Sequence, residues 1–214
     1  MVPLRGVDSI PTAGATPNNH LTKDRIMSNL RMSTVRQIAA EYDALPSLSG
    51  QSTETREIWH ALAFWNSRQA ARLTADLEVI YCDYHPYETA AEQYADILAG
   101  RFKVSTSDCV HPVWSVSANV NYRIVHDILG HTPLPGQSVP EFTLVGELVA
   151  WQRQRAAMVT ADADHRIIVA AFTETVGQLC SAVVSGNGFG VQKVGILPSF
   201  NAADIVNDRP MVTV

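Results

Sequence analysis

The sequence has little basic charge and little cysteine. Only 16 of its 214 residues are Lys or Arg, against 21 Asp or Glu, which gives a formal net charge of -5. Binding to a phosphate backbone needs a clustered basic surface, and no basic run occurs here, so nucleic acid is excluded as the expected partner. The three cysteines, Cys82, Cys109 and Cys180, are odd in number and far apart. They therefore predict neither a disulfide framework nor a zinc knuckle.

Long apolar segments are also missing. No run of about 18 apolar residues is present, so we expect no membrane span. Residues 1–22 are rich in Pro, Thr, Asn and Gly and lack the continuous apolar core of a secretion signal. We expect a cytoplasmic protein with a flexible N-terminal arm at 1–22. A single metal-binding catalytic domain is expected at 23–214, because this length suits one well-buried core.

The hydrophobic pattern predicts a mainly α protein, a compact helical domain with a few short strands. The strongest periodicity lies in 53–77 and in 164–185, and the second of these is apolar nearly all round, as in a core helix. Further helices are expected at 23–42, 85–99 and 141–159 and from 113 through His126, a short strand at 102–106, a strand or connection at 79–81, and a strand or docking tail at 211–214.

Two histidines five residues apart are the most informative feature. Positions five apart differ by about 140° around an α-helix, so we expect His126 and His131 to converge on one atom only if the helix ends between them. Gly130 and Pro133 favour such an ending, because glycine commonly forms the left-handed C-terminal turn and proline prevents the helix from resuming. We therefore expect both imidazoles to face one metal site.

A carboxylate is the expected third ligand. Two histidines and one carboxylate form the facial triad that leaves positions open on Fe(II). Glu174 is the leading candidate, since it lies in the middle of the most apolar segment and a buried carboxylate is costly without compensation. Glu147, flanked by apolar residues at helical spacing, is its rival and a candidate catalytic residue.

The histidine segment resembles the iron motif of the tetrahydropterin-dependent aromatic amino acid hydroxylases, H-[DE]-x-x-G-H-x-P-L, which stands here at 126–134. Weaker likenesses extend across most of the chain, at 54–59, 101–105, Phe142, 172–177 and 194–199. The resemblance implies the fold of the aromatic amino acid hydroxylases, with Fe(II) and tetrahydropterin as cofactors. It also implies His126, His131 and Glu174 as iron ligands.

The resemblance also suggests where other groups would bind. Gly100 stands where the family has an aromatic residue against the pterin, and Phe102 is the nearby candidate to replace it. Asp127 is a candidate to anchor the reductant through water and to act in catalysis. The candidate substrate pocket consists of Trp114, Tyr122, Pro133 and Phe142. The family's substrate-binding arginine has no counterpart in 107–111.

These observations predict a non-haem Fe(II) mono-oxygenase that uses O2 on a small, aromatic or amino-acid-derived metabolite. Two alternatives stay open. One is a metal-dependent hydrolase or di-metal oxidase in which Glu147, Asp127 or Glu141 adds carboxylate ligands to the same histidines. The other is a non-catalytic ligand-binding relative. The expected partners are O2 and the small-molecule substrate, and a homodimer is compatible with all three.

Overall fold

The computed structural model describes residues 31–46, 50–200 and 202–206. The N-terminal arm expected at 1–22 and the strand or tail expected at 211–214 lie outside the described residues, as does the first part of the helix expected at 23–42.

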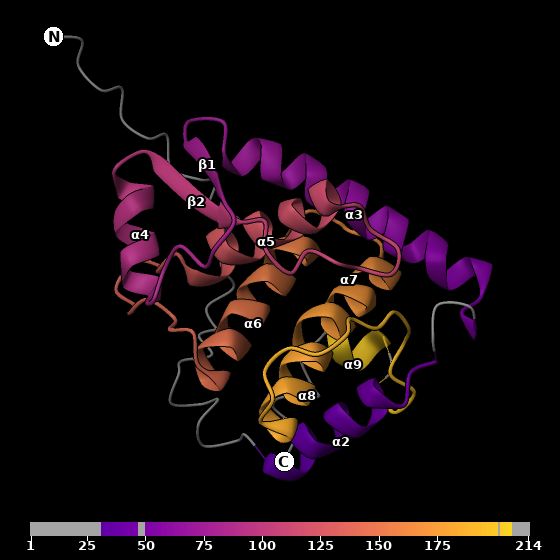
Figure 1. Ribbon diagram of the computed structural model, residues 1–214. Coiled ribbons are helices and arrows are strands. Elements are labelled where there is room, and N and C mark those ends of the chain that lie inside the picture. The colour runs from indigo at the N-terminus through magenta and orange to yellow at the C-terminus, as the bar shows by residue number, and fades with distance from the viewer. Residues whose placement is uncertain (1–30, 47–49, 201, 207–214) are drawn as a thin grey trace, which may run out of the picture.

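The described chain is mainly helical, as predicted, with one small sheet (Figure 1). The α-helices are α2 (Met32–Asp43), α3 (Thr53–Leu73), α4 (Ala90–Leu98), α5 (Val116–His131), α6 (Leu144–Thr160), α7 (His165–Phe172), α8 (Gln178–Ser185) and α9 (Ala202–Val206). A π-helical turn, η2 (Thr173–Gly177), joins α7 to α8, and the strands are β1 (Glu78–Cys82) and β2 (Arg101–Ser105).

Side-chain caps decide where most of these helices begin. The side chains of the N-cap residues Ser52, Thr89, Ser115, Thr143 and Asp164 each accept a hydrogen bond from a backbone N–H in the first turn. Such caps satisfy N–H groups that have no partner within the helix. They explain why α4 and α6 begin a few residues later than the apolar pattern indicates.

The two strands pair in parallel, with Val79 opposite Phe102, and α4 provides the crossover between them. Phe102 is fully buried in a small apolar cluster between this sheet and α5, and Gly100 occupies an exposed left-handed turn just before β2. The expectation that Phe102 binds a cofactor is therefore not favoured, because its ring is already enclosed by protein. Gly100 has a backbone reason to be glycine, namely its positive φ of 78°.

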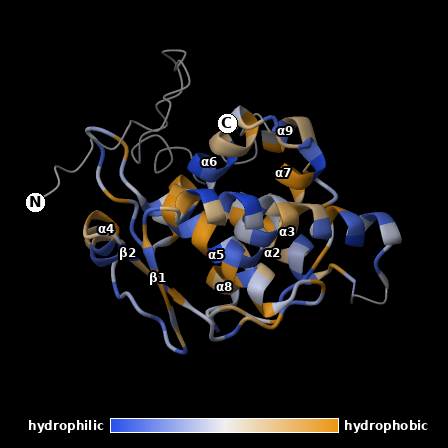
Figure 2. Ribbon diagram, turned by 90° about the horizontal axis from the view of Figure 1, so that it is seen from above, coloured by the Kyte–Doolittle hydropathy of each residue, from blue (hydrophilic) through white to orange (hydrophobic). Residues whose placement is uncertain are grey.

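The main core lies between α2, α3, α5, α6 and the chain from α7 to α9. Orange, apolar segments gather on the inner faces of these helices in Figure 2. The continuous helical stretch His165–Ser185 is long and apolar enough to cross a membrane by length and composition, but 67% of its most apolar window is buried inside this fold. Core helices of soluble proteins pass the same test, so the stretch is explained by packing.

The histidine helix differs from the expectation. α5 runs through Gly130 and ends at His131, and Gly130 is not among the glycines with positive φ. Its role is close packing: a Cβ added to Gly130 would lie 2.6 Å from the Cβ of Ala150 on α6. The prediction of a helix break between the histidines is therefore wrong, since glycine here serves the contact between α5 and α6.

The same contact explains how the two rings converge. Around α5, Gly130 lies about 40° from His126 and about 100° from His131, and so between them. Because Gly130 faces α6, the two histidines leave α5 on either side of the line of contact between the helices. Each side chain can then reach a group that α6 presents between them.

We expect Gly130→Ala to destabilise the protein by about 1–3 kcal/mol, the usual cost of overpacking a tight contact. Helix propensity alone would favour alanine by about 1 kcal/mol, so the two explanations predict opposite signs. Thermal and urea unfolding of the two proteins measures the difference. A more stable variant would show that α5 and α6 are not held this closely.

Candidate metal centre

His126, His131 and Glu147 form the candidate metal centre. Their ligand atoms all lie within 4.8 Å of one another, and no other such group occurs among the described residues. Nε2 of His126 lies 3.0 Å from Oε2 of Glu147, and Nε2 of His131 lies 3.5 Å from Oε1. The two imidazole rings meet edge to face, with centroids 5.3 Å apart. The sequence prediction that the histidines share one site is consistent with this geometry.

In both imidazole rings, the nitrogen that faces away from Glu147 lies next to a hydrogen-bond acceptor. Nδ1 of His131 lies 2.7 Å from the backbone oxygen of Pro140, and Nδ1 of His126 lies 3.2 Å from Oε1 of Gln154. A carbonyl oxygen can only accept a hydrogen bond, so each Nδ1 carries the proton. Metal-binding histidines are commonly held in this way, because the bond fixes the tautomer and aims the other nitrogen at the metal.

The charges of His126 and Glu147 stabilise each other. Burial lowers the pKa of His126, but its hydrogen bond to Glu147 and the charge of that carboxylate outweigh burial and raise the pKa from 6.5 to about 9. Burial raises the pKa of Glu147, yet the hydrogen bond from His126 and the nearness of the His131 ring prevail and lower it from 4.5 to about 2. The metal-free site therefore holds an ion pair between His126 and Glu147.

Arg153 ties the end of α5 to α6. Its Nη1 donates to the backbone oxygens of Gly130 and Thr132, at 3.2 and 2.6 Å, and its Nη2 donates to Oε1 of Gln137. The last carbonyls of a helix have no partner within the helix, and a basic side chain satisfies them. Arg153 thus fixes the backbone on both sides of His131.

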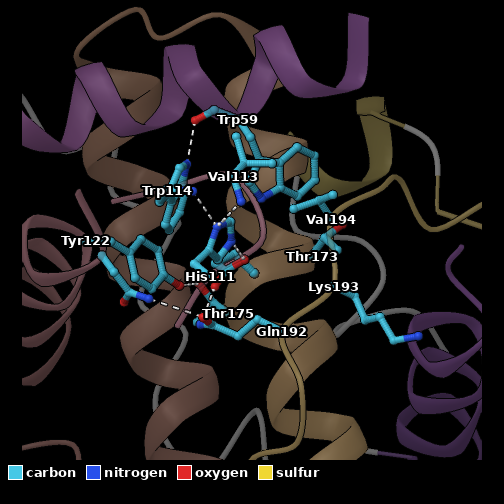
Figure 3. Close-up of polar contacts among 12 residues, drawn as sticks. Trp59, His111, Val113, Trp114, Tyr122, Thr173, Thr175, Gln192, Lys193 and Val194 are labelled. Atoms are coloured by element: carbon cyan, nitrogen blue, oxygen red, sulfur yellow. Dashed lines mark hydrogen bonds and ion pairs between the residues drawn. The ribbon is translucent and has the colours of Figure 1, made fainter. Parts of the chain in front are cut away.

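Glu174 contacts His111 and Gln192 instead, and Figure 3 shows the surroundings of His111. Its Oε2 lies 3.3 Å from Nε2 of His111, and its Oε1 accepts a hydrogen bond of 2.9 Å from Gln192. Nδ1 of His111 accepts two backbone N–H bonds, from Val113 and Trp114. The proton of His111 is therefore on Nε2, where it donates to Glu174.

This arrangement changes the expected ligand set. The structure brings Glu147, and not Glu174, into the group with the two histidines. The burial argument that selected Glu174 was sound, since its side chain is fully buried. Its compensation comes from neutral donors, His111 and Gln192, which the sequence analysis did not identify as partners.

The four candidate residues of the substrate pocket lie at two depths relative to the candidate metal centre. The ring of Phe142 is 39% exposed and meets the ring of His131 edge to face at 4.8 Å. Pro133 is half-buried just beyond α5. These two residues are placed as pocket walls would be. Trp114 and Tyr122 lie deeper, in the main core.

Trp114 and Tyr122 pack against the rings of His111 and His126. The Trp114 ring stacks on His111 at a centroid distance of 4.2 Å and lies 5.4 Å from the ring of Tyr122 (Figure 3). The Tyr122 ring faces that of His126 at 6.3 Å. Tyr122 shares a hydrogen bond with Thr175, and burial raises its pKa well above 10. Both side chains are less than 9% exposed. They are core residues that support His126 and His111, a role distinct from lining an open pocket.

Asp127 and Glu141 are outside the three-residue group. Asp127 is half-buried next to His126, and burial raises its pKa. Its backbone oxygen accepts from Gln93. Glu141 is exposed, and its backbone crosses the first turn of α6, where a Cβ on Gly146 would lie 1.8 Å from its oxygen. Gly146 thus lets the chain fold back beside Glu147.

Comparison with known proteins gave no relatives: no family model, no curated protein and no solved structure matches this chain.

Proposed function

We propose that the protein is a metal-dependent enzyme in which His126, His131 and Glu147 hold one Fe(II), and that it uses O2 to oxidise a small molecule. Two imidazoles and one carboxylate are the donor set of the 2-His-1-carboxylate oxygenases. The proposal concerns the chemistry of the site, and the substrate is left at the level of a small metabolite.

The observation that carries the proposal is Nε2 of His131. This atom is buried and has no hydrogen-bond partner among the described residues. With Nδ1 donating to Pro140, Nε2 is the ring nitrogen that faces the carboxylate oxygen of Glu147, 3.5 Å away. A buried nitrogen left without a hydrogen bond beside a carboxylate oxygen is unfavourable, and a cation between the two atoms would compensate it. A metal ion at this place would satisfy both, so the residues fit the group.

Protein residues would prepare the site in three ways. Pro140 and Gln154 orient the imidazoles, and Arg153 fixes the end of α5. Trp114 and Tyr122 exclude water from the inner side of His126. Fe(II) bound by three such ligands offers open positions for O2 and for the substrate. Phe142 and Pro133, at the accessible side next to His131, are the residues we expect a substrate to contact.

The ligand geometry favours one metal over two. A two-metal site needs ions about 3.5–4 Å apart with bridging ligands, and the described residues contain only one group of three potential ligands. A single zinc ion would also accept two histidines and a glutamate with water in the fourth position. The zinc hydrolase is therefore the second candidate, and it predicts hydrolysis without O2 consumption.

The resemblance of 126–134 to the iron motif of the aromatic amino acid hydroxylases supports iron over zinc. We propose that the chain is a divergent member of that superfamily. Its departures are the use of Glu147 in place of the glutamate in 172–177 and the absence of the substrate-binding arginine. These departures support a substrate other than a free aromatic amino acid.

We expect the purified protein to bind one Fe(II) per chain under anaerobic conditions and to consume O2 when air is admitted. His126→Ala should lower both the iron content and O2 consumption. His85→Ala is the matched control, since His85 is an exposed histidine whose nearest ionic partner is Asp108 at 3.9 Å. Metal analysis and an oxygen electrode make the measurement. Unchanged iron binding in His126→Ala, or no iron binding by the natural protein, would refute the proposal.

A further inference from the structure

Gln154 is the residue on which the further inference rests. It lies on α6, its side chain is fully buried, and its Oε1 is 3.2 Å from Nδ1 of His126. Its Nε2 has no hydrogen-bond partner among the described residues. A buried amide that leaves its own N–H groups unsatisfied costs about 1–3 kcal/mol. Gln154 therefore keeps its contact with His126 although its own Nε2 is left without a hydrogen bond.

The position of Gln154 on the helix explains the contact. Gln154 and Glu147 are seven residues apart, so they lie within about 20° of the same face of α6, two turns from each other. The imidazole of His126 lies between them, with Nε2 toward Glu147 at 3.0 Å and Nδ1 toward Gln154 at 3.2 Å. One helix face thus determines the direction of both ring nitrogens.

The two histidines of the centre are held by different kinds of acceptor. His131 faces the backbone oxygen of Pro140, which no side-chain substitution removes. His126 faces a side-chain amide, which can present either an oxygen or an NH2 group. The oxygen requires the proton on Nδ1 and leaves the Nε2 lone pair for a metal. The NH2 group would require the opposite tautomer, with the Nε2 proton directed at Glu147.

We propose that Gln154 is a positioning residue that holds His126 with its proton on Nδ1 and its Nε2 directed at the metal. The inference rests on the proposed metal centre, and Gln154 itself touches neither metal nor substrate. Outer partners of metal-binding histidines typically change metal affinity by about 10–100-fold when removed. Gln154 would therefore set the affinity of the centre through His126 alone.

The test compares Gln154→Leu with Gln152→Leu. Gln152 is a matched control, because it is also a buried glutamine on α6 with an unpartnered Nε2, and among the described residues its side chain makes no hydrogen bond to His126. We expect Gln154→Leu to weaken Zn(II) binding by about 10–100-fold in a calorimetric or competition titration. Gln152→Leu should retain the natural affinity. Equal affinities in the two variants would overturn the proposal.

A second readout does not depend on a variant. In the Zn(II)-loaded natural protein, long-range 1H–15N NMR spectra distinguish a protonated from a metal-bound ring nitrogen. We expect His126 to have a protonated Nδ1 and a metal-bound Nε2, and a His126 bound through Nδ1 would overturn the proposal. If the natural protein binds no metal, the proposed centre itself fails. Normal binding with an unaffected Gln154→Leu would refute only the role of Gln154.

Discussion

Glu147→Gln should reduce the affinity for Fe(II) or Zn(II) by more than the roughly 10–100-fold typical of an outer partner. The substitution removes one of only three candidate ligands and its negative charge, and a neutral amide is a poor ligand for these metals. The side chain is nearly isosteric, so the packing of α5 on α6 should be retained. A competition titration with a metal indicator measures the affinity.

Two control substitutions test whether the loss of metal affinity is specific to Glu147. Glu141→Gln changes an exposed carboxylate on a residue whose backbone packs against Gly146, and it should leave metal affinity unchanged. Glu174→Gln should also retain affinity within a few-fold, but at a cost in stability. The new NH2 group would face one of the two donors, His111 or Gln192, and an unmatched buried donor costs about 1–3 kcal/mol. Loss of metal binding in Glu174→Gln with full binding in Glu147→Gln would return the ligand role to Glu174.

Metal affinity should rise with pH, by about tenfold per pH unit between pH 6.5 and about 9. The pKa of His126 is raised to about 9 in the metal-free protein, so below that pH a proton must leave Nε2 before a metal can bind. Metal binding to histidine ligands releases such protons. Titrations in buffers of different ionisation enthalpy measure the proton released. A pH-independent affinity would show that His126 is not a ligand.

The metal-free protein should show the opposite trend in stability. The folded pKa of His126 lies above its ordinary value of 6.5, so its contribution is full below pH 6.5 and is lost as the pH rises to about 9. The pKa of Glu147 is lowered, so its contribution is full above pH 4.5 and is lost as the pH falls toward 2. The pair therefore stabilises the metal-free fold most between pH 4.5 and 6.5. Thermal unfolding with and without chelator between pH 6.5 and 9 measures the reversal.

Local sequence patterns predicted the mainly helical character of the fold. Periodicity predicted the long helix at 53–77, and the side chain of Ser52 caps its first turn. The apolar character of 164–185 correctly indicated a core helix, although the π-helical turn at Thr173–Gly177 was not expected. Local patterns work here because caps and amphipathic faces depend on neighbours within a few residues.

Contacts between helices could not be obtained in the same way. Gly130 matched a helix-ending pattern, yet its absent side chain serves the approach of Ala150 on α6. Glu147 and Glu174 were both credible ligands, and only the register of α6 against α5 distinguishes them. That register depends on packing between residues about 20 apart in sequence, for which a single sequence gives no direct signal.

The most direct test of the account is a crystal structure of the natural protein grown anaerobically with Fe(II), with an anomalous difference map at the iron edge. The account predicts one peak within coordination distance, about 2.0–2.2 Å, of Nε2 of His126, Nε2 of His131 and a carboxylate oxygen of Glu147. A peak bound to Glu174, or no peak between the two histidines, would contradict it.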